Sequence, residues 1–127
     1  MIVNDPATLA QLRDVFARYE AALVGNDIAT LDELFWQDAR AIRYGVAENL
    51  HGIGEILAFR KGRSPANLAR ELSRTVITTF GSDFATASTL FSRAGSPGWV
   101  GRQMQSWVRM DDGWRVVAAH VSVIDAP

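Results

Sequence analysis

The chain of 127 residues is 48% hydrophobic and carries a formal net charge of −1, which suits one globular domain, residues 1–127, with one core and room for a pocket. A nearly neutral chain offers no basic field to a polyanion, so we expect neither a nucleic acid nor a membrane surface as a partner. Because there is no cysteine, no long apolar run and no secretory signal in the first residues, we expect a cytoplasmic protein without disulfides.

The basic residues are almost all arginine: the chain has twelve Arg and one Lys, Lys61. A guanidinium is a flat fork that binds a carboxylate through two hydrogen bonds and stays charged when it is partly desolvated. Codon bias in a GC-rich genome gives the same excess, so only the position of each arginine can decide between these explanations.

The first helix begins at Asp5 and Pro6, the N-cap and the first helical position, and ends at residues 25–27. Its apolar residues recur at helical spacing and face the interior: Leu9, Leu12, Phe16, Tyr19 and Leu23. A buried tyrosine needs a partner for its hydroxyl, and either a backbone carbonyl or a ligand can supply one.

A second helix is predicted over residues 28–35, followed by a short strand over 39–45 that carries Arg43 between small residues on one face. A salt bridge to Glu48 or Glu20 and a ligand-binding role are both open for Arg43.

A third helix is predicted over residues 52–63, with Arg60 on its apolar stripe. A guanidinium on a buried stripe needs a protein acid or a bound anion, because desolvating it alone costs several kcal/mol. Arg63 lies at the helix end, where we expect it to extend to the rim and to solvent.

Long antiparallel strands fill the rest of the chain and end in a hairpin over residues 100–123 that turns at 111–113. Strict alternation places five residues on one face of the last strand: Trp114, Val116, Ala118, His120 and Ser122. The opposite face carries Val117, Ala119, Val121 and Val123, too apolar for water, so we expect a homodimer through that outer face.

This order of elements, with a first helix across a bent sheet, resembles the nuclear transport factor 2-like superfamily, also described as SnoaL-like or cystatin-like. The fold class implied is α+β: three N-terminal helices on a strongly curved, mainly antiparallel sheet that encloses one pocket. The segments YEAALVGND, LDELFW, RYGVAENLHG, FRKGR, TFGSD, GRQMQSWVR and GWRVVAAHVS together resemble the AtzH-like branch.

That resemblance implies proteins encoded beside a bacterial amidase in the catabolism of ureide-type nitrogen compounds. In this branch a tyrosine of the first helix and an arginine of the first strand are implicated in converting a carboxylated urea, of the 1,3-dicarboxyurea-to-allophanate type, to its smaller product. The matching positions here are Tyr19 and Arg43.

Our hypothesis is a metal-independent enzyme in which Tyr19 and Arg43 are catalytic. Arg43 binds a substrate carboxylate, Arg60 adds positive potential, and Tyr19 moves a proton as the C–N bond is hydrolysed or CO₂ is lost. The other expected substrate-binding residues are His120, as reserve acid or base, and Ser122, Gln105, Phe16 and Trp107.

We expect no cofactor. The two histidines, His51 and His120, lack the spacing of a zinc site, and no glycine-rich loop joins a strand to a helix.

Two other functions stay open. One is a non-catalytic module that holds a small anion or assists an amidase. The other is an isomerase or cyclase of the ketosteroid isomerase or polyketide cyclase type, which is disfavoured because no acid lies on strands 84–109 or 114–123.

Overall fold

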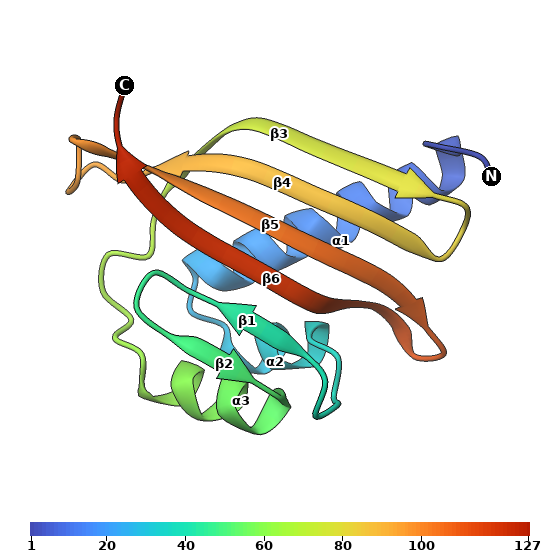
Figure 1. The fold of residues 1–127 in the computed structure, drawn as a ribbon, viewed down its shortest axis with the longest axis horizontal. Coiled ribbons are helices and arrows are strands. Elements are labelled where there is room, and N and C mark those ends of the chain that lie inside the picture. The colour runs from blue at the N-terminus through green and yellow to red at the C-terminus, as the bar shows by residue number, and fades with distance from the viewer.

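The structure of the protein, a computed structural model, describes residues 1–127 and consists of three helices and one six-stranded sheet (Figure 1). The helices are α1 (Pro6–Val24), α2 (Ile28–Leu34) and α3 (Ile53–Gly62). The strands are β1 (Ile42–Tyr44), β2 (Asn49–His51), β3 (Glu71–Phe80), β4 (Phe84–Ser92), β5 (Trp99–Met110) and β6 (Gly113–Asp125). The predicted α+β class is confirmed. None of the helices combines the length and the apolar composition needed to cross a membrane.

Helix α1 begins and ends where the sequence predicts. The Asp5 carboxylate accepts a hydrogen bond from the Thr8 amide, Pro6 takes the first helical position, and the helix ends at Gly25. Its buried residues are Thr8, Leu12, Phe16, Tyr19, Ala22 and Leu23. This stripe packs on the inner face of the sheet, which lies in front of α1 in Figure 1.

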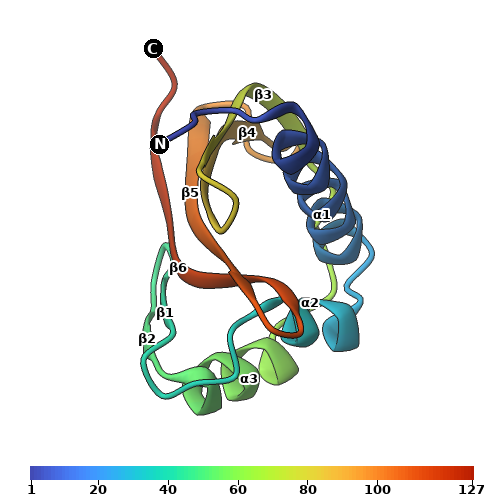
Figure 2. The same cartoon turned by 90° about the vertical axis from the view of Figure 1, so that its right-hand side faces the viewer.

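The strand order is β2-β1-β6-β5-β4-β3, and every pair is antiparallel except β1 with β6. The short strand β2 is not predicted by the sequence; it pairs with β1 and leads directly into α3. Figure 2 shows the sheet curving opposite α1, with α2 and α3 covering one end of the space between them. A ligand could therefore enter only the space that remains between α1, the end of α3 and the inner face of the sheet.

A β-bulge in β6 reverses the predicted faces of the last strand. Ser106 pairs with Ala118, but the next residue, Trp107, pairs with Val116, so Val117 has no partner in this register. One extra residue shifts the alternation by one and moves every later side chain to the other face. Figure 2 shows β6 bending sharply partway along its length, as a bulged strand does.

The two faces of β6 are therefore assigned differently from the prediction. Trp114 and Val116 face the core as expected, but beyond the bulge the inward residues are Ala119, Val121 and Val123. His120 is exposed on the outer face. The prediction that Ala119, Val121 and Val123 form the outer face is wrong, because the unpaired Val117 cannot be recognised in the run Val116–Ala119.

Candidate functional site

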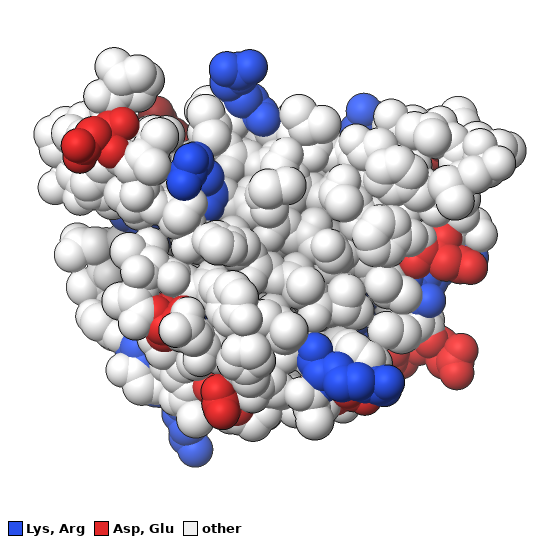
Figure 3. All heavy atoms as spheres, in the orientation of Figure 1, with Lys and Arg blue, Asp and Glu red and all other residues white.

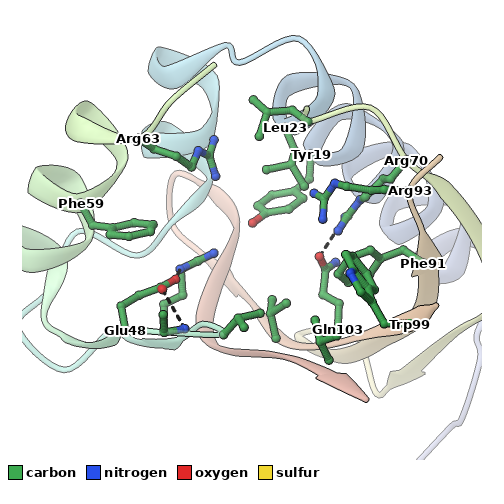
Figure 4. Close-up of a pocket in the computed structure, with 16 residues that line it drawn as sticks. Tyr19, Leu23, Glu48, Phe59, Arg63, Arg70, Phe91, Arg93, Trp99 and Gln103 are labelled. Carbon is green, nitrogen blue, oxygen red and sulfur yellow. Dashed lines mark hydrogen bonds and ion pairs between the residues drawn. The ribbon is translucent and has the colours of Figure 1, made fainter. Parts of the chain in front are cut away.

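A cavity of about 370 Å³ lies between α1, the end of α3 and the inner face of the sheet. This volume is near the lower end of the roughly 300–1,000 Å³ typical of small-molecule sites. Its walls combine aliphatic and aromatic side chains with a few polar groups: Tyr19, Leu23, Arg43, Val46, Ala47, Glu48, Phe59, Arg63, Leu68, Arg70, Phe91, Arg93, Trp99, Gln103, Val121 and Val123 (Figure 4). Residues from both ends of the chain thus form one site.

Tyr19 lies on the buried stripe of α1, and its hydroxyl points into the cavity (Figure 4). The ring is 4% exposed and packs edge-on against Trp107, with ring centroids 6.1 Å apart. A tilted contact with Phe35, at 6.3 Å, supports it from the side. No protein group hydrogen-bonds the hydroxyl, so the packing fixes the ring while the phenol is left for a ligand or water.

Arg43 also reaches the cavity, but it is bound to an acid of the chain. Its Nη1 donates to Glu48 Oε1 at 2.8 Å, and its guanidinium lies over the Phe59 ring at 5.3 Å. The other carboxylate oxygen of Glu48 accepts from the Ala47 amide at 3.2 Å. Gly45 makes this fold-back possible, because a Cβ there would overlap the Glu48 carboxylate. The salt bridge left open by the sequence is therefore present, although further N–H donors of Arg43 are free of it.

Arg70 is bound to an acid even more completely. Its Nε and Nη2 donate to the two carboxylate oxygens of Glu20 at 2.9 and 2.6 Å, a bidentate pair in which the Arg70 side chain is 2% exposed. Nη2 also donates to Gln103 Oε1 at 2.9 Å, and the guanidinium stacks on Phe91 at 4.5 Å. Arg70 therefore forms part of the wall rather than a free binding group.

Arg63 and Arg93 face the cavity without an acid partner. The one side-chain hydrogen bond of Arg63 is long, 3.4 Å from Nη2 to Asn26 Oδ1, and the Nε atoms of both arginines are buried without an acceptor. Burial lowers the pKa of Arg63, and the nearby Arg60 and Arg43 lower it further. Burial also lowers the pKa of Arg93, with Arg70 as the second cause.

The cavity consequently has an excess of positive charge. Four guanidinium groups line it, and carboxylates balance two of them, Glu48 at Arg43 and Glu20 at Arg70. Four positive charges less two negative charges leave two, on Arg63 and Arg93. Because arginine stays protonated at any physiological pH, these charges are permanent in the absence of a ligand.

Arg60 does not reach the cavity, contrary to the prediction. It is 3% exposed, donates to Asp32 Oδ1 at 2.8 Å and stacks on the Phe35 ring at 4.9 Å. Asp32 on α2 is the acid that this buried guanidinium requires. The arginine that enters the site is instead Arg63, which lies just beyond the end of α3. The prediction had Arg63 extend to the rim and to solvent.

His120 and Ser122 are also away from the cavity, because the bulge in β6 turns them outward. His120 packs edge-on against Tyr44, with ring centroids 6.1 Å apart, and Ser122 accepts a hydrogen bond from Arg102 Nε at 3.1 Å. The other histidine, His51, lies within hydrogen-bonding distance of the Tyr44 hydroxyl at 3.2 Å. Nowhere in the chain do three or more His, Asp or Glu side chains converge as metal ligands would.

The last three predicted residues lie beside the cavity or beneath it. Trp107 is fully buried behind Tyr19, and its indole N–H donates to Gln105 Oε1 at 3.0 Å, so both belong to the core. Phe16 is buried one turn before Tyr19 and borders a separate groove beside β3.

Sequence reasoning missed Arg70, Arg93, Gln103 and Glu48 as cavity residues. For Gln103 a signal was present, because it alternates with Gln105 and Trp107 along one face of β5. Arg93 follows β4 in a loop sequence without periodicity, and nothing in the pattern marks it.

Comparisons with known proteins agree with this architecture. A family model described as AtzH-like matches residues 1–127. The crystal structure of a protein of unknown function from Pectobacterium atrosepticum, of the DUF3225 family, is 58% identical with a TM-score of 0.95 and covers 96% of this chain and 94% of that one. A cystatin-like fold protein from Burkholderia xenovorans is 49% identical, with a TM-score of 0.96, and covers 100% of this chain and 99% of that one.

A more distant structure extends the likeness in fold alone. It is an NTF2-like protein of unknown function from Pseudomonas putida, 18% identical with a TM-score of 0.79, covering 93% of this chain and 87% of that one. None of the curated proteins compared with the chain matches it. The cystatin-like, NTF2-like fold expected from the resemblance is thereby confirmed.

Proposed function

The chain belongs to the AtzH-like family, and from this membership and the charge of its cavity we propose that it is an enzyme that removes a carboxyl group from a small carboxylated urea. The observation that carries the proposal is the Tyr19 hydroxyl, which enters a cavity with two unbalanced positive charges and is bound by no protein group. An anionic ligand supplies the missing negative charge, and the phenol is then positioned to act on it.

In the proposed reaction the substrate carboxylate lies against the cavity guanidinium groups, including the donors of Arg43 that Glu48 does not use. The bond between the urea nitrogen and its carboxyl carbon breaks, the electron pair stays on the nitrogen, and CO₂ leaves. Tyr19 donates its hydroxyl proton to that nitrogen, and the tyrosinate regains a proton from solvent. Atoms and charges balance without a redox partner.

We favour loss of CO₂ over hydrolysis because hydrolysis needs a base that activates water. Glu48 is the one carboxylate that lines the cavity, and both of its oxygens already accept hydrogen bonds, from Arg43 and from the Ala47 amide. The same engagement disfavours an isomerase or cyclase, which needs a free carboxylate base in the cavity.

The test is turnover of an N-carboxylated urea, measured as release of CO₂, by the wild-type protein and Tyr19→Phe. Removing the proton while keeping the ring should lower kcat at least about 100-fold, the usual contribution of a positioned general acid. Tyr44→Phe is the matched control, because Tyr44 lies outside the cavity and should keep wild-type turnover. Unchanged turnover in Tyr19→Phe contradicts the proposal.

A purely binding function is the second candidate, and the Arg43–Glu48 pair supports it, because that pair is already satisfied without a substrate. Under this alternative the protein holds a small anion and assists an amidase. Anion binding without CO₂ release from any carboxylated urea, together with co-purification with the amidase, would favour it.

We also propose that two copies associate through the outer sheet face. Figure 3 views this face and shows few charged groups across its centre. Met104, 61% exposed, lies there opposite His120 in the register of β5 and β6. A sheet face with few charges at its centre and with exposed apolar groups favours association. The molar mass in solution, measured by light scattering, tests this proposal.

A further inference from the structure

The carboxylate of Glu48 lies where Arg43 would bind an anion in the cavity. One of its oxygens accepts a hydrogen bond from Arg43 Nη1 at 2.8 Å, and both side chains are mostly buried. Its other oxygen accepts from the Ala47 amide instead of from Arg43. Arg43 therefore binds a carboxylate of its own chain, but through a single nitrogen.

The acid at Arg70 is held in a different way. Glu20 binds Arg70 through both carboxylate oxygens, at 2.9 and 2.6 Å, in the bidentate arrangement that suits a guanidinium best. The single bond between Arg43 and Glu48 leaves the remaining N–H donors of Arg43 unused. A ligand carboxylate that binds Arg43 in the bidentate manner thus forms one more hydrogen bond with it than Glu48 does.

Glu48 belongs to a surface turn, so its carboxylate has a path out of the cavity. The turn joins β1 to β2, and Val46 and Ala47 within it are exposed. The carboxylate can fold back because Gly45 has no Cβ, which would overlap it. The φ angle of Gly45 is not in the left-handed region that favours glycine. Gly45 therefore provides space for the carboxylate and not a special backbone conformation.

A ligand and Glu48 meet at the same place in the cavity. Figure 4 shows Glu48, Phe59 and Arg63 along one side of the cavity, with Tyr19 facing them. A ligand carboxylate that reaches this side finds the unused donors of Arg43 beside the negative charge of Glu48. Two carboxylates on one partly buried guanidinium repel each other, so the ligand and Glu48 compete for it.

We propose that Glu48 is an internal competitor of the ligand: it neutralises Arg43 while no ligand is bound, and a ligand carboxylate binds by displacing it toward solvent. The inference deepens the proposed function by naming a residue that limits the affinity of the site, and it rests on that function only in taking Arg43 as an anion-binding group. Glu48 acts through Arg43 and is a positioning residue. Because the displaced carboxylate leaves the cavity, it adds no free base there.

The experiment is titration calorimetry at neutral pH with ureidoacetate, a urea whose single carboxylate is attached to carbon. Glu48→Gln keeps the size of the side chain but removes its charge. It should bind ureidoacetate about tenfold more tightly than the wild type, because the fraction of protein with Arg43 free limits the apparent affinity. Gly45→Ala keeps the charge of Glu48 but takes its space in the cavity, and should tighten binding about threefold or more.

A control and a second measurement complete the design. Glu33→Gln removes the same charge from an exposed pair with Arg18 and should keep the wild-type affinity. In the wild-type protein, saturating ureidoacetate should speed hydrogen exchange of the Ala47 amide about threefold or more, as measured by NMR. That amide loses its acceptor when the Glu48 carboxylate leaves. A merely structural Glu48 predicts weaker binding in Glu48→Gln and no faster exchange at Ala47.

Three results overturn the inference. The first is that Glu48→Gln or Gly45→Ala binds ureidoacetate no more tightly than the wild type. The second is that ureidoacetate binds and Ala47 exchange does not accelerate, and the third is that neither the wild type nor the two variants bind ureidoacetate.

Binding and turnover separate this inference from the proposed function, because ureidoacetate has no carboxyl group on nitrogen to lose. Tighter binding in Glu48→Gln and Gly45→Ala without CO₂ release from an N-carboxylated urea supports the competition and contradicts the enzyme. CO₂ release by the wild type, with unchanged affinity for ureidoacetate in both variants, supports the enzyme and contradicts the competition.

Discussion

The packed layer of the protein and its cavity use the same residue type in opposite ways. In the packed layer, which includes the part of the cavity wall at Arg70, the side chains of Arg60 and Arg70 are almost fully buried, and each is bound to a carboxylate of the chain. In the cavity, Arg63 and Arg93 are half-buried and have no acid at all. Since an unpaired guanidinium loses hydration without compensation, we propose that the first pair serves stability and the second serves a ligand.

The largest effect should follow from breaking a pair of the packed layer. Arg70→Met leaves the Glu20 carboxylate without its bidentate partner, and we expect a loss of about 3–5 kcal/mol in the free energy of unfolding. Urea titration measures it. The double variant Glu20→Gln, Arg70→Met removes both charges and should recover part of the loss. If Arg70→Met is as stable as the wild type, the paired arginines do not contribute to stability more than the unpaired ones.

Removal of an unpaired arginine of the cavity should raise the free energy of unfolding instead of lowering it. Arg93→Met replaces an unpaired, partly buried charge with an apolar side chain, and should raise the free energy of unfolding by about 1 kcal/mol in the absence of ligand. The gain should disappear when glutarate is added, because only the wild-type protein is then stabilised by binding. Arg109→Met, which breaks an exposed pair with Asp83, is the control and should not be stabilising. If Arg93→Met is less stable than the wild type, Arg93 serves stability, as Arg60 and Arg70 do.

The smallest effect belongs to an exposed pair, Asp38 with Arg40. Hydrogen bonds from the Arg40 side chain and amide lower the pKa of Asp38 from 3.8 to about 2. A folded-state pKa below the unfolded value stabilises the fold above about pH 4, and this contribution is lost as the pH falls toward 2. Thermal unfolding of Asp38→Asn should therefore show a slightly lower Tm than the wild type at pH 6 and the same Tm near pH 2. An offset that persists at pH 2 would contradict this origin.

Local patterns were sufficient to predict the helices, the long strands and the inward direction of Tyr19, and the family resemblance supplied the fold class. The helical spacing of apolar residues fixed the direction of Tyr19, and the capping residues fixed the limits of α1. Arg43 was placed on the correct strand, with the salt bridge to Glu48 as one of two possibilities. These features depend on neighbours within a few residues, which the sequence displays directly.

The remainder of the site depends on contacts that the sequence does not display. Whether Arg60 or Arg63 enters the cavity depends on Asp32 of another helix, 28 residues away. Which face of β6 is inward depends on the unpaired Val117, whose type is the same as that of its neighbour Val116. Alternation is a reliable guide to a strand only until its register shifts, and everything predicted beyond that point is then reversed.

The parallel pairing of β1 with β6 determines when the cavity can exist during synthesis. Ile42 pairs with Ala118, and the wall residues Val121 and Val123 follow every other part of the site in the chain. A nascent chain on the ribosome would therefore expose Tyr19 and Arg43 long before the strand that closes over them is available. Contacts between segments so distant in sequence form slowly. Acquisition of ligand affinity would accordingly report the final stage of folding, after the helices have already formed.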